Sequence, residues 1–125
     1  MKKTLFALAL IAALPLSVQA DEPDSPYPPV HITNSTNYNL YGTVSYLSIF
    51  CSDDEFSIKP NEAWRASDRG MCLVKEIEAT VRSSLGDIPA TSYFSNGTSH
   101  SEFAIIALSN AYETLPIAFE VTRKD

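Results

Sequence analysis

The sequence is poor in the residues that build catalytic and metal centres. It contains two cysteines and two histidines among 125 residues. Cys51 and Cys72 lack the C-x2-C spacing of zinc and redox sites, and no G-x-S-x-G segment supplies a nucleophile elbow. We therefore expect no metal, no cofactor and no enzymatic activity.

The histidine with the most suggestive neighbours is His100, which lies between Ser99 and Ser101. Nucleophilic catalysis needs a base within hydrogen-bond reach of the nucleophile and a third group that orients the base. Adjacent residues of an extended segment point to opposite faces. We interpret this segment as a polar turn.

Consecutive acids occur at Asp53, Asp54 and Glu55, without the alternating spacing of a calcium loop. We interpret them as a solvated acidic turn. A small enzyme that uses its carboxylates is the last-ranked functional hypothesis.

Basic residues are scarce: 9 stand against 15 acidic ones, for a net charge of −6. An acidic surface repels phosphate backbones and anionic lipid headgroups. The charge argues against nucleic acid as a partner and is compatible with a cationic protein.

Long apolar runs are absent except near the amino terminus, between Leu5 and Val18. This run follows Lys2 and Lys3 and ends in Val18-Gln19-Ala20, which is typical of a bacterial signal peptide and too short for a membrane span. We expect residues 1–20 to be removed after export to the periplasm or beyond. Cleavage would leave 7 basic against 15 acidic residues, a net charge of −8.

Residues 21–29 hold four prolines and three acids. Proline lacks a backbone donor and favours extended chain, so this segment is predicted to be an acidic tether. Residues 30–125 have the length of a single domain.

Within that domain, apolar and polar side chains alternate in short runs. Val30 and Ile32 alternate with polar neighbours, and Phe119 and Val121 do so near the carboxyl end. Lys59-Pro60-Asn61-Glu62 has the composition of a tight turn, and Asn96-Gly97 that of a hairpin turn. The pattern predicts an all-β fold, a small antiparallel β-sandwich or small barrel of about seven to eight strands.

The segment Leu73–Leu85 has two interpretations. Leu73, Ile77, Val81 and Leu85 are four apart, as on one face of a helix. As a strand, Leu73, Ile77 and Val81 share a face that Lys75 interrupts. The β-branched residues favour the strand.

Two cysteines in an exported domain predict a disulfide between Cys51 and Cys72. We place Cys51 at the end of one strand and Cys72 at the start of another, so that the bond ties the base of a hairpin, formed by Glu55–Lys59 and Glu62–Ala66, to the next strand. The following residues, 65–70, are expected to be exposed, and Trp64 is expected to face the core.

The first functional hypothesis is a non-enzymatic binding protein of the inhibitor or immunity type, acting on a protein partner. The alternative is a glycan- or lipid-binding module, in which tyrosine rings stack on sugars or sit at a lipid interface. The candidate binding residues are Trp64, Arg65, Asp68, Arg69, Tyr38, Tyr41 and Tyr93.

Overall fold

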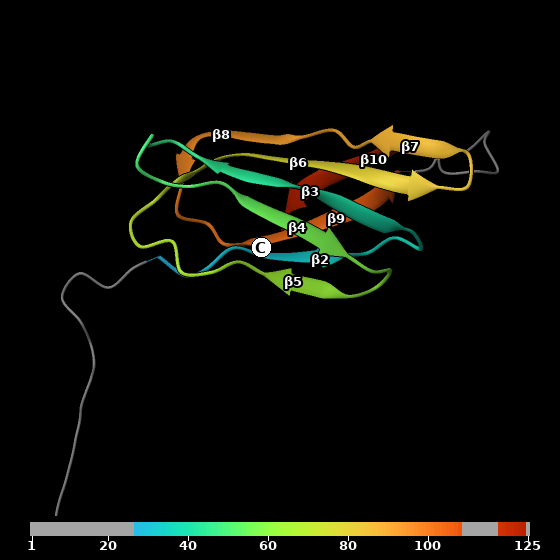
Figure 1. The fold of residues 1–125 in the computed structure, drawn as a ribbon, viewed down its shortest axis with the longest axis horizontal. Coiled ribbons are helices and arrows are strands. Elements are labelled where there is room, and N and C mark those ends of the chain that lie inside the picture. Colours follow the sequence, from blue (N-terminus) through green and yellow to red (C-terminus); the bar gives the residue numbers. More distant parts are fainter. Residues whose placement is uncertain (1–26, 109–117, 125) are drawn as a thin grey trace, which may run out of the picture.

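The computed structural model describes residues 27–108 and 118–124, which form two β-sheets (Figure 1). The strands are β2 (His31–Asn34), β3 (Asn39–Tyr46), β4 (Asp54–Ile58), β5 (Ala63–Arg65), β6 (Val74–Ser83), β7 (Gly86–Pro89), β8 (Tyr93–Thr98), β9 (Glu102–Leu108) and β10 (Ala118–Arg123). No α-helix occurs in these two ranges, and so none there has the length and apolar character to cross a bilayer. The all-β prediction is confirmed.

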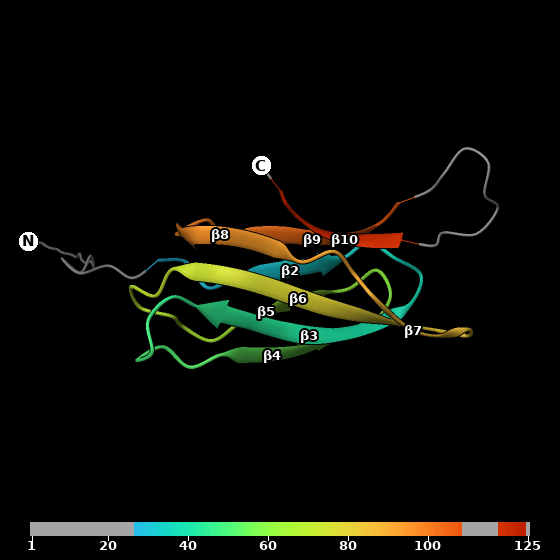
Figure 2. The ribbon, with the colours of Figure 1, turned by 90° about the horizontal axis from the view of Figure 1, so that it is seen from above.

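The two sheets lie in layers, with β3 and β4 on one side of the molecule and β9 and β10 on the other (Figure 2). One sheet has the order β10-β9-β2-β5. The other has the order β4-β3-β6-β7, and β8 also pairs with β6. The pairing is antiparallel except between β2 and β9, which run parallel. The two layered sheets agree with the expected sandwich. The fully antiparallel arrangement is wrong, and the described residues form nine strands where about seven to eight were expected.

The core fills the space between the layers with apolar side chains from alternate strand positions. Along β3, Leu40 and Val44 are buried while Tyr41 and Thr43 face outward. Removal of this surface from water is the main stabilising contribution. The largest fully buried side chains are Phe103, Phe119, Ile32, Leu40, Ile77 and Ile105.

Gly42 occupies a core-facing position on β3 at which no side chain fits. A Cβ atom there would fall on the carbonyl oxygen of Glu78 and lie 2.6 Å from the ring of Phe56. The ring of Phe56, on the adjacent strand, therefore covers the glycine and fills the space.

The segment with two interpretations is a strand, β6, so the preferred prediction is confirmed. A register shift between Ser45/Tyr46 and Val74/Glu76 changes the phase of the strand. Val74 and Ile77 are both buried as a result, and Lys75 is exposed between them. This bulge explains how a lysine interrupts the apolar pattern without entering the core.

The predicted hairpin of Glu55–Lys59 and Glu62–Ala66 is wrong. β4 pairs with β3, whereas β5 pairs with β2 in the other sheet. The turn between them is present, since the Glu62 amide donates to the Lys59 carbonyl at 3.2 Å and Asn61 has a φ of 61°. The turn carries the chain from one layer to the other. Its amino-acid composition is the same as that of a hairpin turn, so the sequence alone does not distinguish the two connections.

The second turn prediction, at Asn96-Gly97, is also wrong. Both residues lie inside β8, where Gly97 has a φ of 111°. The side chain of Leu47 packs where a Cβ of Gly97 would lie. Glycine is needed here for a close approach and a left-handed φ within a strand, not for a hairpin.

Candidate functional site

Two tight turns lie at one end of the molecule, on the left in Figure 1. In the first, the Cys51 amide donates to the Ser48 carbonyl at 3.0 Å. In the second, the Cys72 amide donates to the Arg69 carbonyl at 2.9 Å, and Gly70 has a φ of 55°. A disulfide joins Cys51 to Cys72, the last residues of the two turns. We call residues 48–51 and 69–72 the stapled turns.

The disulfide prediction is confirmed, and each cysteine lies near the end of a strand as expected, but the predicted hairpin between them does not form. Cys51 belongs to the loop after β3, and Cys72 lies two residues before β6. These strands are neighbours, and the Leu47 amide extends their ladder by donating to the Leu73 carbonyl at 3.0 Å. The disulfide therefore fixes the two connections just beyond the end of the ladder.

The corners of the stapled turns carry exposed apolar side chains. Ile49 and Phe50 are each 92% exposed and Met71 is 58% exposed. Corner positions of turns usually hold Gly, Pro, Asn, Asp or Ser, which suit the backbone and the solvent. Clustered apolar side chains on the surface often mark a contact surface. These three residues are the strongest candidates for recognition in the described chain.

The expectation that residues 65–70 are exposed is wrong for two of them, since Ala66 is 6% exposed and Arg69 is 5% exposed. The Arg69 guanidinium donates to backbone carbonyls only and lies 5.5 Å from the centre of the Tyr27 ring. Burial lowers the pKa of this guanidinium below its usual value. Arg69 thus ties the second turn to the segments around it. The accepting carbonyls belong to Pro28, Cys72, Thr98, Ser99 and His100.

The chain before β2 contacts the same turn. The Tyr27 amide donates to the Gly70 carbonyl at 2.8 Å, and the Pro28 carbonyl accepts from Arg69. Residues 27–29, the last part of the predicted tether, therefore include two residues that contact the domain, Tyr27 and Pro28. The rest of that tether, 21–26, and the predicted signal peptide, 1–20, lie outside the described residues.

A hollow of about 270 Å³ opens beside the stapled turns. Asp54 lies in its wall and accepts a hydrogen bond from the Tyr46 hydroxyl at 2.5 Å. Burial, and then this bond, raise the pKa of the Tyr46 phenol above its usual value. Asp54 begins β4 and is half-buried, so the expectation of a solvated acidic turn fails for it. Asp68, a predicted binding residue, also lines the hollow.

Two other predicted binding residues lie on β5. Trp64 is half-buried and packs against the core as expected, with its ring centre 5.3 Å from that of Phe56, but it is not one of the fully buried core residues. Arg65 is exposed and stands opposite His31 of β2. Neither residue lines the hollow.

Tyr38 and Tyr93 pack their rings inward. Tyr38 makes an edge contact with Phe119 at 5.8 Å between ring centres, and Tyr93 makes one with Phe103 at 5.0 Å. Both are partly buried against the core. Their stacking faces are therefore partly occupied by the protein itself.

Tyr41 lies on the outer face of the five-stranded sheet, beside a second hollow of about 340 Å³. The guanidinium of Arg82 lies 4.7 Å from the centre of its ring, and its hydroxyl donates to Asp87 at 3.1 Å. Glu55 and Glu78 also line this hollow. Of the three tyrosines predicted to bind a ligand, only Tyr41 borders either of the two hollows, and Arg82 covers one face of its ring.

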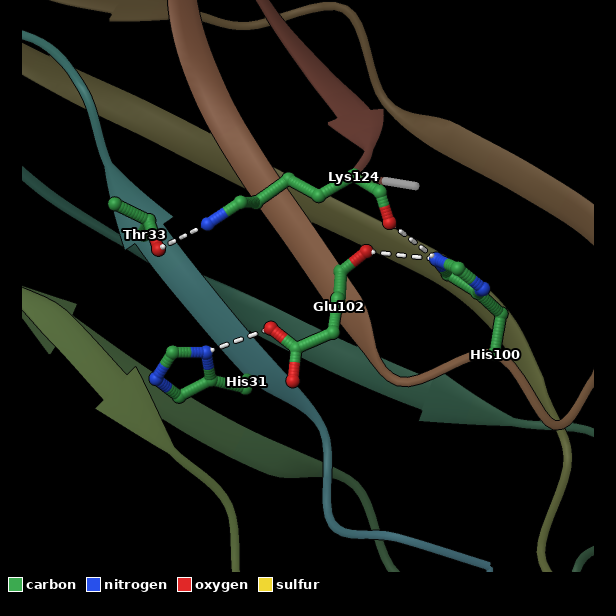
Figure 3. Close-up of polar contacts among 5 residues, drawn as sticks. All are labelled: His31, Thr33, His100, Glu102 and Lys124. Atoms are coloured by element: carbon green, nitrogen blue, oxygen red, sulfur yellow. Dashed lines mark hydrogen bonds and ion pairs between the residues drawn. The ribbon is translucent and has the colours of Figure 1, made fainter.

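Both histidines lie close to Glu102 (Figure 3). His31 Nδ1 lies 3.0 Å from Glu102 Oε1. His100 Nε2 lies 2.9 Å from the Glu102 carbonyl and 3.0 Å from the Lys124 carbonyl. Because both of these carbonyls are acceptors, Nε2 carries the hydrogen and donates to them. The Lys124 ammonium donates a hydrogen bond to the Thr33 hydroxyl at 3.4 Å. These contacts join β2, β9 and the end of β10.

No family model matches the chain, and no curated protein or solved structure matches it. In the part of the chain that the structure describes, no three metal-binding side chains are grouped to hold an ion. The functional argument therefore rests on the geometry of the stapled turns and the hollow beside them.

The sequence contained a signal for the apolar corners that was missed. Thr43 and Ser45 show that odd positions of this strand face solvent. Leu47 and Ile49 continue the odd positions with apolar side chains. This change from polar to apolar side chains at the solvent-facing positions indicates either the end of the strand or an exposed apolar surface. Both occur here.

Proposed function

We propose that this protein is an exported, non-enzymatic binding protein that contacts a protein partner through its stapled turns. The observation that carries the proposal is the pair Ile49 and Phe50, both 92% exposed at the corner of a turn that a disulfide holds in place. A fixed turn loses little conformational entropy on binding, which favours affinity.

The chemistry around the corners favours a protein as the partner. Aromatic residues and methionine are enriched in the cores of protein interfaces, and Phe50 and Met71 supply both. Asp53 and Asp68 are exposed nearby in the same loops. An apolar patch with an acidic border suits an apolar pocket with a basic border, such as the substrate site of a secreted enzyme. A protein that covers such a site would act as an inhibitor or immunity-type protein.

A glycan or lipid partner receives less support. A sugar platform needs an open aromatic face, and Tyr41 has one face under Arg82. The acidic border of the turns opposes anionic bilayers. A zwitterionic vesicle remains a useful control, because exposed Ile49 and Phe50 suit any apolar phase.

Export is part of the same proposal. The Cys51–Cys72 disulfide is compatible with an oxidising compartment, where such bonds persist. The amino-terminal sequence predicts the route, through a signal peptide removed after Ala20.

The proposal is tested with the double variant Ile49→Ser/Phe50→Ser. A partner is first captured with the wild-type protein from the source's envelope and secreted fraction, then purified and titrated. We expect the variant to bind at least about tenfold more weakly, because each apolar side chain buried at an interface contributes roughly 1.5–3 kcal/mol. Its melting temperature should match wild type, since both side chains lie outside the core.

Leu85→Ser is the matched control, because Leu85 is 82% exposed in the turn between β6 and β7. It should bind like wild type. Equal affinity of the double variant and wild type would refute the proposal. Binding of the wild type to zwitterionic vesicles, lost in the double variant, together with failure to bind any protein, would assign the turns to a membrane instead.

A further inference from the structure

We propose that the hollow beside the stapled turns receives one arginine or lysine side chain of the protein partner. The inference rests on the proposed function and adds the chemistry that the partner must present. That partner would carry a projecting cation next to the apolar pocket that covers Ile49 and Phe50.

The hollow has the position that this pairing requires. Phe50 and Cys51 line it together with Asp54 and Asp68, so the apolar corner and the carboxylates border one space. Its volume, about 270 Å³, lies below the roughly 300–1,000 Å³ of clefts that enclose whole small molecules. A single long side chain suits a space of this size.

The two carboxylates have no cation of their own. Within residues 27–108 and 118–124, neither Asp54 nor Asp68 forms an ion pair. Asp54 accepts from Tyr46, and from Ser67 at 3.5 Å, both neutral donors. A carboxylate has about four acceptor positions, so both groups retain the capacity to accept from a guanidinium or ammonium.

Arg69 is the one cation that lines the hollow, and its donors are used elsewhere. Its Nε, Nη1 and Nη2 atoms all donate to backbone carbonyls, and none donates to Asp54 or Asp68. One positive charge therefore faces two negative ones across the hollow. The remaining negative charge attracts a second cation from outside.

Phe50 adds a second contribution to binding. The exposed ring of Phe50 lines the same hollow as the carboxylates, so an arginine bound there can contact it. Its methylene groups can lie against the ring, and its guanidinium can make a cation–π contact. The same residue thus contributes to the apolar contact and to recognition of the cation.

The test uses N-acetylarginine amide as the probe and N-acetylcitrulline amide as its neutral analogue, followed by amide chemical shifts in NMR. We expect saturable shifts in the millimolar range at Ser52, Ser67 and Asp68 with the arginine probe, and none with citrulline. Asp68→Asn should weaken binding of the probe about two- to fivefold. Glu62→Gln is the matched control and should change nothing, because Glu62 is an exposed acid in the turn between β4 and β5.

Three results would overturn the inference. They are no shifts with the arginine probe, equal shifts with citrulline, and shifts confined to the other hollow near Glu55 and Glu78. The purified partner separates this inference from the proposed function. If Ile49→Ser/Phe50→Ser loses the partner while Asp68→Asn keeps full affinity, the cation site is wrong and the function stands. If Ile49→Ser/Phe50→Ser keeps full affinity, both are wrong.

Discussion

Replacement of Arg69 with Met is expected to lower the free energy of unfolding by about 3–5 kcal/mol. Methionine matches the length of the side chain but has no donor. The five partly buried backbone carbonyls that accept from Arg69 would lose this donor together, and a fully buried acceptor without a partner costs roughly 1–3 kcal/mol. Water that enters the site would recover part of this loss, so the sum is not fully additive.

Thermal unfolding measures this change. A domain of this size loses roughly 4–8 °C of melting temperature per kcal/mol, so the Arg69→Met variant should melt at least about 12 °C below wild type. Arg69→Lys should fall between them, because an ammonium has three donors and no planar fork. Arg65→Met is the control, since Arg65 is exposed, and should stay within about 0.5 kcal/mol. If Arg69→Met melts like Arg65→Met, the carbonyl contacts contribute nothing to stability.

Replacement of both Cys51 and Cys72 with Ala is expected to cost about 2–4 kcal/mol of stability, because the bond closes a loop with a sequence separation of 21. Domains of this size have only about 5–15 kcal/mol in total. We expect partner binding to weaken as well, even at temperatures where the variant is fully folded. The corners Ile49 and Phe50 would then be ordered only at the moment of binding, which costs conformational entropy.

Circular dichroism melting and calorimetric titration of the double alanine variant separate the two effects. A variant that melts like wild type would show that the disulfide is not a structural staple. A variant that melts earlier but binds the partner with unchanged affinity below its transition would show that the turns need no fixing. The second result would leave the disulfide with a structural role alone.

The fold class could be predicted because the apolar alternation of β3, β6 and β10 is a local property of the sequence. The choice of strand for Leu73–Leu85 was correct for the same reason, since β-branched side chains suit a pleated surface. The bulge that turns Lys75 away from the core could not be predicted, because a bulge depends on the register of the neighbouring strand. The structure shows that register, between Ser45/Tyr46 and Val74/Glu76.

Pairing of strands could not be predicted, because similar turn chemistry serves several connections. Lys59-Pro60-Asn61-Glu62 forms its tight turn, yet the chain crosses to the other sheet. Gly97 has the left-handed φ that an Asn-Gly pair predicts, yet it lies within a strand. In both places the local conformation was right and the partner strand was set by contacts distant in sequence.

The candidate site shows the same division. The disulfide and Asp68 could be proposed from the sequence, because two cysteines have only one possible pairing and the charge of an aspartate is a property of that residue alone. The burial of Arg69 could not, since its acceptors lie between 3 and 41 positions away along the chain. The exposed corners were not predicted, because Leu47, Ile49 and Phe50 have the composition of a strand and directly follow one. Only the fold shows that β3 ends at Tyr46.

The central claim is that the stapled turns contact a protein partner. The most direct measurement places the photo-crosslinking residue p-benzoylphenylalanine at Phe50 in one variant and at Leu85 in another. The benzophenone at Phe50 should form a covalent adduct with the captured partner on irradiation, and the one at Leu85 should not. An adduct from Leu85 without one from Phe50 would contradict the claim and place the interface at the opposite end of the molecule.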